Sequence, residues 1–345
     1  MKFNKIPIPK KNRLSIFVRK EFYHSMSQKK IIITGGAGFI GSNLVEKYLN
    51  DDRVELVRVI DNLSNGYYSN IEEFEGHPKF EFFEEDICDY NKMLELTKGF
   101  DLISHQAALG SVPRSIENPM QSTKVNIDGT VNILYAAVQN KIDRVVLACS
   151  SSTYGDSPNL PKQEDIIGNP LSPYAVTKFA VELYAEVFHK TYGLNFVGLR
   201  YFNIFGPRQN PDNPYAAVIP IFCKALIHGN EPTINGDGET SRDFTFVENA
   251  VHANDLALFT ENKEALNQIY NVACGDQMSL NDMISLLKDI SGKDIKPTYG
   301  PERPGDVKHS KADISKIENL LGYKPQVRFK EGLGKVFKWY EKMRF

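Results

Sequence analysis

The stretch Lys30-Ile-Ile-Ile-Thr-Gly-Gly-Ala-Gly-Phe-Ile-Gly41 decides the fold class of this 345-residue chain. Its β-branched first half is typical of a strand that is buried on both faces in a parallel sheet. Glycines follow at once, and apolar residues then recur at helical spacing, at Leu44, Val45, Tyr48 and Leu49. The order of strand, glycine-rich turn and helix predicts the opening of a nucleotide-binding βαβ unit.

Further strand and helix patterns continue along the chain. Compact apolar runs predict strands at residues 55–60, 101–104, 144–148 and 195–199. Apolar residues at helical spacing predict helices over 127–138 and 175–188. Because strands alternate with helices of this length, we expect a right-handed, doubly wound parallel sheet, the Rossmann arrangement of the α/β class.

The composition and the pattern of the sequence change after about residue 200. Residues 203–245 are rich in Pro, Asn and Gly, and short helical patterns alternate with loops from there onward. We therefore expect three parts: a basic N-terminal extension over 1–28, a nucleotide-binding Rossmann domain over 29–202, and a smaller α/β substrate-binding domain over 203–345. The last is expected to be interleaved with the second.

The composition excludes several classes of protein. With 41% hydrophobic and 24% charged residues, the chain is of the ordinary globular type rather than disordered. No apolar run approaches the roughly 18 residues that a membrane span needs. The formal net charge of −2 gives no reason to expect nucleic acid. We expect neither a membrane nor nucleic acid as a partner.

The first thirty residues are strongly basic, with nine Lys or Arg and one acid, Glu21. The apolar stretch 14–18 is too short for a signal peptide and is closed by Arg19 and Lys20. We interpret this extension as a solvated leader, with an arm for a membrane surface or nucleic acid as the alternative.

Cysteine usage bears on the compartment and on metals. The cysteines lie far apart without a C-x-x-C pair, at Cys88, Cys149, Cys223 and Cys274. This spacing argues against a disulfide framework and against a Cys-ligated zinc site. It suits a reducing cytoplasm, so we expect a cytoplasmic protein without a metal.

The glycine motif predicts a dinucleotide site. Gly35 would allow the tight turn, Gly38 the close approach of a pyrophosphate, and Gly41 close packing of helix on sheet. The helix N-terminus offers N–H groups to the phosphates. Asp61 follows twenty residues beyond Gly41, where a carboxylate would accept the ribose hydroxyls and repel a 2′-phosphate. The motif therefore favours NAD over NADP as cofactor, although Asp61 as a plain strand-end turn residue is the alternative.

A catalytic constellation is predicted further along the chain. Tyr174 and Lys178 are four residues apart, on one face of a helix. A neighbouring ammonium and a cationic nicotinamide would lower the pKa of the phenol from its usual value of about 10 and make it a base. Ser150, at the end of a predicted strand, would share the proton with a reacting alcohol.

With these motifs in place, the chain resembles the extended short-chain dehydrogenase/reductase family over nearly all of residues 29–345. The glycine motif, Tyr174-x-x-x-Lys178 and Arg200-Tyr-Phe-Asn203 stand in the family's order. Within it the chain is similar to nucleotide-sugar 4-epimerases, above all the bacterial UDP-N-acetylglucosamine 4-epimerases of surface-polysaccharide pathways. Three longer strings carry this likeness, 108–115, 235–243 and 306–310.

The resemblance implies a mechanism and a set of roles. Tyr174 takes the proton of the sugar 4-hydroxyl, C4 gives a hydride to NAD⁺, and the 4-keto sugar turns before the hydride returns to its other face. Lys178 binds the nicotinamide ribose and Ser150 is the hydrogen-bonding partner of Tyr174. The cofactor is further lined by Phe39, Ile40, Asn62, Asp86, Ile87 and Gln106. The UDP is held by Asn203, Val218, Arg242, Arg303 and Asp306, with the two arginines at the phosphates.

The resemblance also implies how the sugar is selected. Ser310 borders the position of the sugar 2-substituent, where a large aromatic residue leaves space only for a hydroxyl and a small one admits an N-acetyl group. Ser111 and Ser152 are candidate partners of that group. We therefore expect UDP-GlcNAc and UDP-GalNAc as substrates, with Ser310 as a plain loop hydroxyl as the alternative.

Other functions stay open at this point. Related dehydratases and decarboxylases carry an acidic pair where this chain has Ser151 and Ser152, which argues against elimination. The alternatives are a 4-epimerase of UDP-glucose, one of a UDP-N-acetylhexuronic acid with Arg114 at the carboxylate, and a non-catalytic nucleotide sensor. The family resemblance further suggests a homodimer. The sequence assigns no role to Arg114, Lys308 or His309.

Overall fold

The computed structural model describes residues 28–212, 217–294, 296–302 and 308–343. The expected N-terminal extension, except for Gln28, and the predicted UDP ligands Arg303 and Asp306 lie outside these residues. No helix within the described ranges combines the length and the apolar character that crossing a membrane requires.

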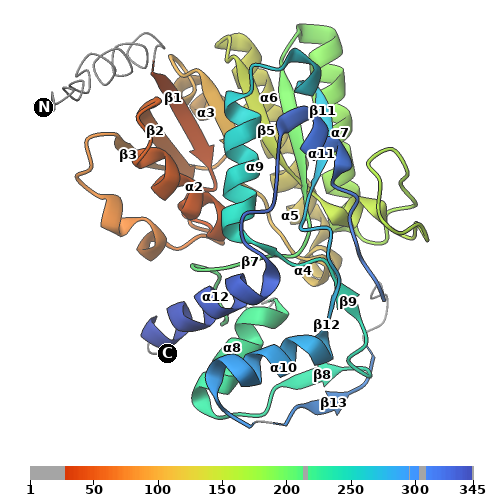
Figure 1. The fold of residues 1–345 in the computed structure, drawn as a ribbon. Helices are drawn as coiled ribbons and strands as arrows, with labels where there is room; N and C mark the ends of the chain where they lie inside the picture. The colour runs from red at the N-terminus through yellow and green to blue at the C-terminus, as the bar shows by residue number, and fades with distance from the viewer. Residues whose placement is uncertain (1–27, 213–216, 295, 303–307, 344–345) are drawn as a thin grey trace, which may run out of the picture.

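A parallel sheet of seven strands forms the centre of the described chain (Figure 1). The strand order is β11-β6-β5-β4-β1-β2-β3, and every neighbouring pair is parallel. The strands are β1 Lys29–Thr34, β2 Val54–Asp61, β3 Phe80–Glu84, β4 Leu102–His105, β5 Arg144–Ser150, β6 Phe196–Tyr201 and β11 Gln268–Val272. The predicted α/β class with a doubly wound sheet is confirmed.

Helices cover both faces of the sheet. On one face α2 (Phe39–Leu49), α9 (Val247–Phe259) and α11 (Ser315–Leu321) pack against apolar side chains such as Ile31 and Ile33. On the other face α3 (Tyr90–Leu96), α6 (Gly129–Gln139) and α7 (Pro173–Tyr192) pack against side chains such as Ile32. Because successive strand residues point to opposite faces, the run Ile31-Ile-Ile33 fills both cores, as its unbroken apolar character predicts.

Two outer strands escaped the sequence analysis. β3 reads Phe-Glu-Phe-Phe-Glu and is only half buried at the sheet edge. β11 forms the opposite edge and pairs with β6, about seventy residues earlier in the chain. The predicted start of the helix over 127–138 was also wrong, because a π-helical turn, Lys124–Asp128, precedes α6. The buried side chains of α6 are those of Thr130, Ile133, Leu134, Ala136 and Ala137.

Apart from α9, β11 and α11, which belong to the sheet and its covering helices, the main elements of residues 203–343 form a second apolar core. This core lies below the sheet in Figure 1. Its helices are α8 (Val218–His228), α10 (Leu280–Ser291) and α12 (Phe329–Met343). Short ladders join β7 (Ile204–Phe205) to β10 (Thr245–Phe246), β9 (Ser241–Arg242) to β12 (Met278–Ser279), and β8 (Thr233–Asn235) to β13 (Thr298–Gly300). The chain leaves this core to form α9 and β11 at the sheet, returns to it for β12, α10 and β13, and leaves it again for α11 before it ends in α12.

The remaining helices are short. α4 (Val112–Glu117) and α5 (Pro119–Thr123) follow β4 and pack against α7. Single 3₁₀ turns occupy Tyr68–Asn70, Glu72–Phe74, Ser151–Tyr154 and Lys263–Ala265.

Candidate active site

A cavity of about 340 Å³ opens at the carboxyl ends of the central strands. This is the edge of a doubly wound sheet at which ligands bind in general. The cavity brings together the three predicted catalytic residues, every predicted cofactor residue, and Asn203. Those residues are Ser150, Tyr174, Lys178, Gly35, Gly38, Phe39, Ile40, Gly41, Asp61, Asn62, Asp86, Ile87 and Gln106.

The glycine turn between β1 and α2 has no space for side chains. Gly35 has a φ of +70°, and a Cβ there would lie 2.7 Å from the backbone nitrogen of Ala107. A Cβ on Gly41 would lie 2.1 Å from the carbonyl oxygen of Gly35. Gly35 and Gly41 therefore allow the turn and the close approach of α2 to β1, and Gly38 lies between them on the cavity wall.

Asp61 ends β2 and is 8% exposed. Its Oδ2 accepts the backbone N–H of Ala37 at 3.0 Å, and its Oδ1 accepts that of Leu63 at 2.9 Å. Burial raises the pKa of this carboxyl, and the two N–H groups oppose the rise. Asp61 is thus a turn residue that also lines the cavity, and the two N–H donors fix the orientation of its carboxylate.

The three predicted catalytic residues come from two elements. Ser150 ends β5, while Tyr174 and Lys178 lie on the first two turns of α7. The Ser172 side chain caps α7 by accepting the N–H of Ala175 at 3.1 Å. The Lys178 Nζ donates to the carbonyl of Ala148 on β5 at 2.8 Å and lies 6.0 Å from the centre of the Tyr174 ring.

The protonation states in the protein alone differ from the expectation. Burial raises the pKa of Tyr174 above 10, and a hydrogen bond with Ser150 opposes this rise. Burial also lowers the pKa of Lys178 to about 8, against the charges of Cys149 and Glu182. Burial of the phenol therefore outweighs its hydrogen bond with Ser150, and the chain's own groups leave Tyr174 protonated at neutral pH.

Asn126 is a site residue that sequence reasoning missed. It lies in the π-helical turn before α6 and is fully buried. Its side chain accepts the N–H of Leu109 at 2.8 Å and donates to Thr177 Oγ1 at 3.0 Å, and that hydroxyl donates to the carbonyl of Tyr174 at 2.8 Å. Asn126 thereby ties a cavity-lining loop to the catalytic helix. The π-helical turn is the local feature that distinguishes Asn126, and no pattern of residue spacing in the sequence predicts such a turn.

His105 lies at the end of β4 and is 3% exposed. Its Nδ1 is 2.7 Å from Thr34 Oγ1 and its Nε2 is 2.9 Å from Thr130 Oγ1. Burial, with the Lys178 charge, lowers the pKa of His105 to about 3. The imidazole is therefore neutral in the folded protein at neutral pH.

This neutral imidazole predicts an acid-sensitive fold. The pKa of His105 is about 6.5 in the unfolded chain, so below that pH the unfolded chain binds a proton that the folded chain does not, and stability falls as the pH falls. Between pH 7 and pH 5 the wild type should lose about 2 kcal/mol more unfolding free energy than His105→Gln. Urea unfolding of both proteins at the two pH values measures this, and equal losses would contradict it.

The predicted substrate residues lie in several places. Asn203 faces the cavity with a φ of +41°, and its Nδ2 donates to the carbonyl of Asp243 at 3.0 Å. Arg242 and Ser310 are neighbours across Ser241, whose carbonyl accepts the Arg242 Nη1 at 3.0 Å and the Ser310 N–H at 3.0 Å. Val218 begins α8. Among the predicted substrate residues that the structure describes, Asn203 lines the cavity, whereas Ser111, Ser152, Val218, Arg242 and Ser310 do not.

The small serines have defined partners. The Ser111 hydroxyl accepts the N–H of Arg114 at 3.2 Å and caps α4. The Ser152 hydroxyl donates to the Ser150 hydroxyl at 2.9 Å, so Ser152 orients Ser150.

Three residues without a predicted role also have neighbours. Arg114 donates from Nη2 to Asn65 Oδ1 at 2.9 Å, on the cavity-lining loop after β2. The His309 Nδ1 lies 2.8 Å from Ser241 Oγ, and the Lys308 carbonyl accepts the Ser241 N–H at 2.9 Å.

Known proteins resemble the chain over nearly its whole length. It matches the family model described as GDP-mannose 4,6 dehydratase over residues 32–336. The UDP-glucose 4-epimerase of Mycolicibacterium smegmatis is 35% identical over 314 residues, 90% of this chain and 98% of that protein.

Two solved structures extend the comparison. UDP-N-acetylglucosamine 4-epimerase from Methanobrevibacter ruminantium, in complex with UDP-N-acetylmuramic acid, is 40% identical with a TM-score of 0.87, over 92% of this chain and 100% of that chain. UDP-glucuronic acid 4-epimerase from Bacillus cereus, with UDP-glucuronic acid and NAD, is 33% identical with a TM-score of 0.85, over 91% of this chain and 99% of that chain. The chain therefore belongs to the extended short-chain dehydrogenase/reductase family, in the group of nucleotide-sugar enzymes that the GDP-mannose 4,6 dehydratase model represents.

Proposed function

We propose that this protein is an NAD-dependent 4-epimerase of UDP-sugars and that it interconverts UDP-GlcNAc and UDP-GalNAc. The observation that carries the proposal is the shared cavity, because it joins a dinucleotide-type glycine turn and Asp61 to Ser150, Tyr174 and Lys178. The 4-epimerases among the similar proteins support the reaction class.

The residues of the cavity fit a dinucleotide. Side chains at Gly35 and Gly41 would collide with backbone, so a bare backbone turn stands at the N-terminus of α2, where phosphates bind favourably. The fixed carboxylate of Asp61 suits the two hydroxyls of an adenosine ribose and disfavours a 2′-phosphate. Lys178 on the opposite wall would hold the second ribose.

The chain's own groups then perform the proton transfer. Bound NAD would supply a hydride acceptor that is regenerated within each turnover, and the positive charge of its ring would favour the phenolate form of Tyr174. The Tyr174 phenolate removes the proton from the sugar 4-hydroxyl and returns it after the keto sugar has turned. Ser150 donates to the same oxygen and is oriented by Ser152.

The residues favour epimerisation over elimination. A dehydratase needs an acid near the sugar to expel water, but the positions after Ser150 hold Ser151 and Ser152 in a 3₁₀ turn. A non-catalytic sensor would have no use for Tyr174 and Lys178 together with Ser150. We therefore retain the epimerase reaction.

Three observations favour the N-acetylated sugars. Ser310 is small, and its N–H is held by Ser241 beside Arg242. Arg114, the candidate partner of a hexuronic carboxylate, donates to Asn65 on the dinucleotide side of the cavity. The similar enzyme from Methanobrevibacter ruminantium is a UDP-N-acetylglucosamine 4-epimerase.

Incubation with single UDP-sugars and no added cofactor tests the function. Proton NMR should show UDP-GlcNAc and UDP-GalNAc approaching the same mixture from either side. UDP-Glc should react more slowly, and UDP-glucuronic acid should not react. Strict dependence on added NAD⁺, or a dehydrated product, would contradict the proposal.

We also propose that the protein works in the cytoplasm, in the synthesis of surface polysaccharides. The location is supported by its cysteines, because Cys88, Cys149, Cys223 and Cys274, all within the described residues, are free thiols. The pathway rests on the resemblance to bacterial enzymes of that kind.

A homodimer is the last part of the proposal. Val176, Leu183 and Val187 form an exposed apolar stripe along α7, and Ile116 and Met120 are exposed on the helices packed beside it. We expect a second copy of the chain to cover this stripe. Sedimentation should show a dimer that Leu183→Glu with Val187→Glu converts to monomer, whereas the control Leu171→Glu should remain dimeric; an unchanged mass for the double variant would contradict it.

A further inference from the structure

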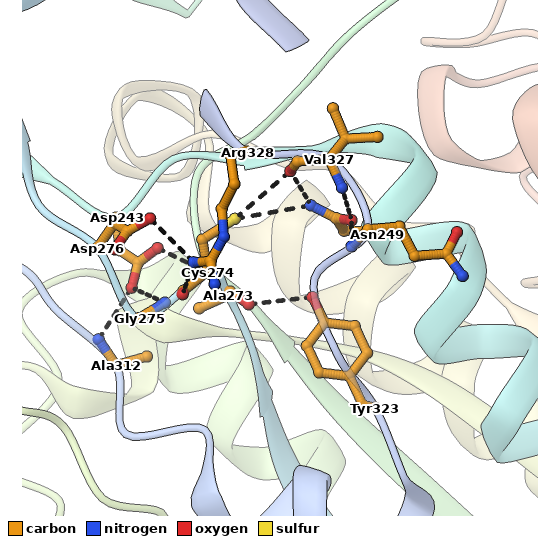
Figure 2. Close-up of polar contacts among 11 residues, drawn as sticks. Asp243, Asn249, Ala273, Cys274, Gly275, Asp276, Ala312, Tyr323, Val327 and Arg328 are labelled. Carbon is orange, nitrogen blue, oxygen red and sulfur yellow. Dashed lines mark hydrogen bonds and ion pairs between the residues drawn. The ribbon is translucent and has the colours of Figure 1, made fainter. Parts of the chain in front are cut away.

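Asp243 is a fully buried carboxylate at the meeting point of three distant segments (Figure 2). Its Oδ1 accepts the N–H of Cys274 at 3.0 Å. Its Oδ2 accepts the N–H of Gly275 at 3.0 Å and that of Ala312 at 3.2 Å. One side chain therefore joins the residues after β9 to the residues that follow β11 and to the segment 308–312.

The segment 308–312 is the one that carries Ser310. It runs beside β9, where the Lys308 carbonyl accepts the N–H of Ser241 at 2.9 Å and the N–H of Ser310 donates to the Ser241 carbonyl at 3.0 Å. The carboxylate of Asp243 holds Ala312, two residues beyond Ser310. Ser310 is thus anchored on both sides by residues 241–243.

Asp243 also holds a residue of the cavity wall. Its carbonyl accepts Asn203 Nδ2 at 3.0 Å, and the Asn203 carbonyl accepts the N–H of Thr245 at 3.3 Å. Asn203 has a φ of +41°, a conformation that needs such external support. The same short segment thereby fixes a residue of the cavity and the segment that bears the sugar gate.

We infer that Asp243 is a positioning residue for the sugar, which sets the distance between Ser310 and the cavity wall at Asn203 and so determines the selection of the 2-substituent. This inference rests on the proposed function, because it concerns the same UDP-sugar site. Asp243 itself does not line the cavity and touches no reacting atom.

The position requires a carboxylate. Three N–H groups converge on its two oxygens, and a carboxylate can accept all of them. An amide has one accepting oxygen, and its NH₂ group would face an N–H donor. Asp243→Asn should therefore lose at least one of these three N–H contacts while it preserves the shape of the core.

Asn249 offers a matched control in the same cluster (Figure 2). It is also fully buried, and its side chain accepts the N–H of Gln326 at 2.7 Å and that of Val327 at 3.0 Å and donates to the Val327 carbonyl at 2.7 Å. Asn249→Ala should release the segment before α12 and lower the melting temperature. The Asn249 Nδ2 also donates to Cys274 Sγ at 3.6 Å, but none of these hydrogen bonds reaches residues 308–312 or Asn203, so we expect both to stay in place.

The experiment compares Asp243→Asn with Asn249→Ala. For Asp243→Asn we expect KM for UDP-GlcNAc to rise about tenfold to a hundredfold, with kcat within about threefold and a weaker preference over UDP-Glc. Hydrogen exchange should quicken in residues 308–313. For Asn249→Ala we expect a lower melting temperature, with KM within about twofold. Bound NAD should be equal in both proteins.

A second variant addresses the same contact without touching the carboxylate. Ala312→Pro deletes the N–H that Asp243 accepts, and the extended bridge between Ala312 and Lys162 suits a proline because it does not use that N–H. It should reproduce the KM rise. If either variant folds and keeps the wild-type KM and selectivity, the inference is wrong. If the wild type converts no UDP-sugar, the proposed function fails, whatever the exchange data show.

Discussion

Tyr174→Phe is expected to reduce kcat by about 10²–10⁴-fold or more, because it removes the proton acceptor of the reaction and leaves the rest of the cavity intact. The ring remains packed at the start of α7, and the Tyr174 N–H still donates to Ser115 Oγ at 3.0 Å. Calorimetry should show UDP-GlcNAc bound within about threefold of the wild-type Kd, since the phenol contributes chiefly to the transition state.

Tyr184→Phe on the same helix is the matched control, because its ring is partly exposed and away from the cavity. It should retain full activity. Lys178→Ala should be nearly as damaging as Tyr174→Phe and should also weaken NAD binding. More than about a tenth of the wild-type kcat in Tyr174→Phe would show that another group is the base.

Ser310→Tyr is expected to abolish turnover of UDP-GlcNAc and UDP-GalNAc and to spare or improve turnover of UDP-Glc and UDP-Gal. A phenol ring would fill the space that an acetamido group needs, whereas a hydroxyl still fits. The wild type is expected to prefer the N-acetylated sugars, and this preference requires hydrogen bonds to the acetamido group. When a sugar without that group binds, the polar atoms of the protein that would bond to it stay unpaired, at a cost of roughly 1–3 kcal/mol each.

The effect of Ser310→Tyr is measured by NMR on all four UDP-sugars. Ser315→Tyr, at the exposed start of α11, is the control and should leave both pairs unchanged. Equal damage to both pairs, or none to either, would remove Ser310 from the sugar pocket.

The sequence predicted the sheet and the residues of the cavity because their signals are local. The run before Gly35 is buried on both faces, the glycines need only their immediate turn, and Tyr174 and Lys178 are joined by helix geometry alone. Parallel strands then bring these local features to one edge. The structure places them on one cavity, while their roles remain predictions.

The features that the sequence did not predict depend on contacts between residues far apart in the chain. Nothing around Asn126 shows that its amide meets Thr177, about fifty residues later. Asp243 is recognisable only once Cys274 and Ala312 are beside it. Likewise, the pKa of Tyr174 follows from burial, which no spacing of residues reports. Long-range contacts, not local propensity, decide these features.

The most direct test of the central claim follows the hydrogen on C4. The protein, purified without added cofactor, is incubated with UDP-GlcNAc that carries deuterium at C4, and the product is examined by NMR and mass spectrometry. We expect UDP-GalNAc that retains the deuterium at C4, formed by protein that releases about one NAD(H) per chain on denaturation. Loss of the deuterium to water, or a product that keeps the original C4 configuration while losing water, would contradict epimerisation through a transient 4-keto sugar.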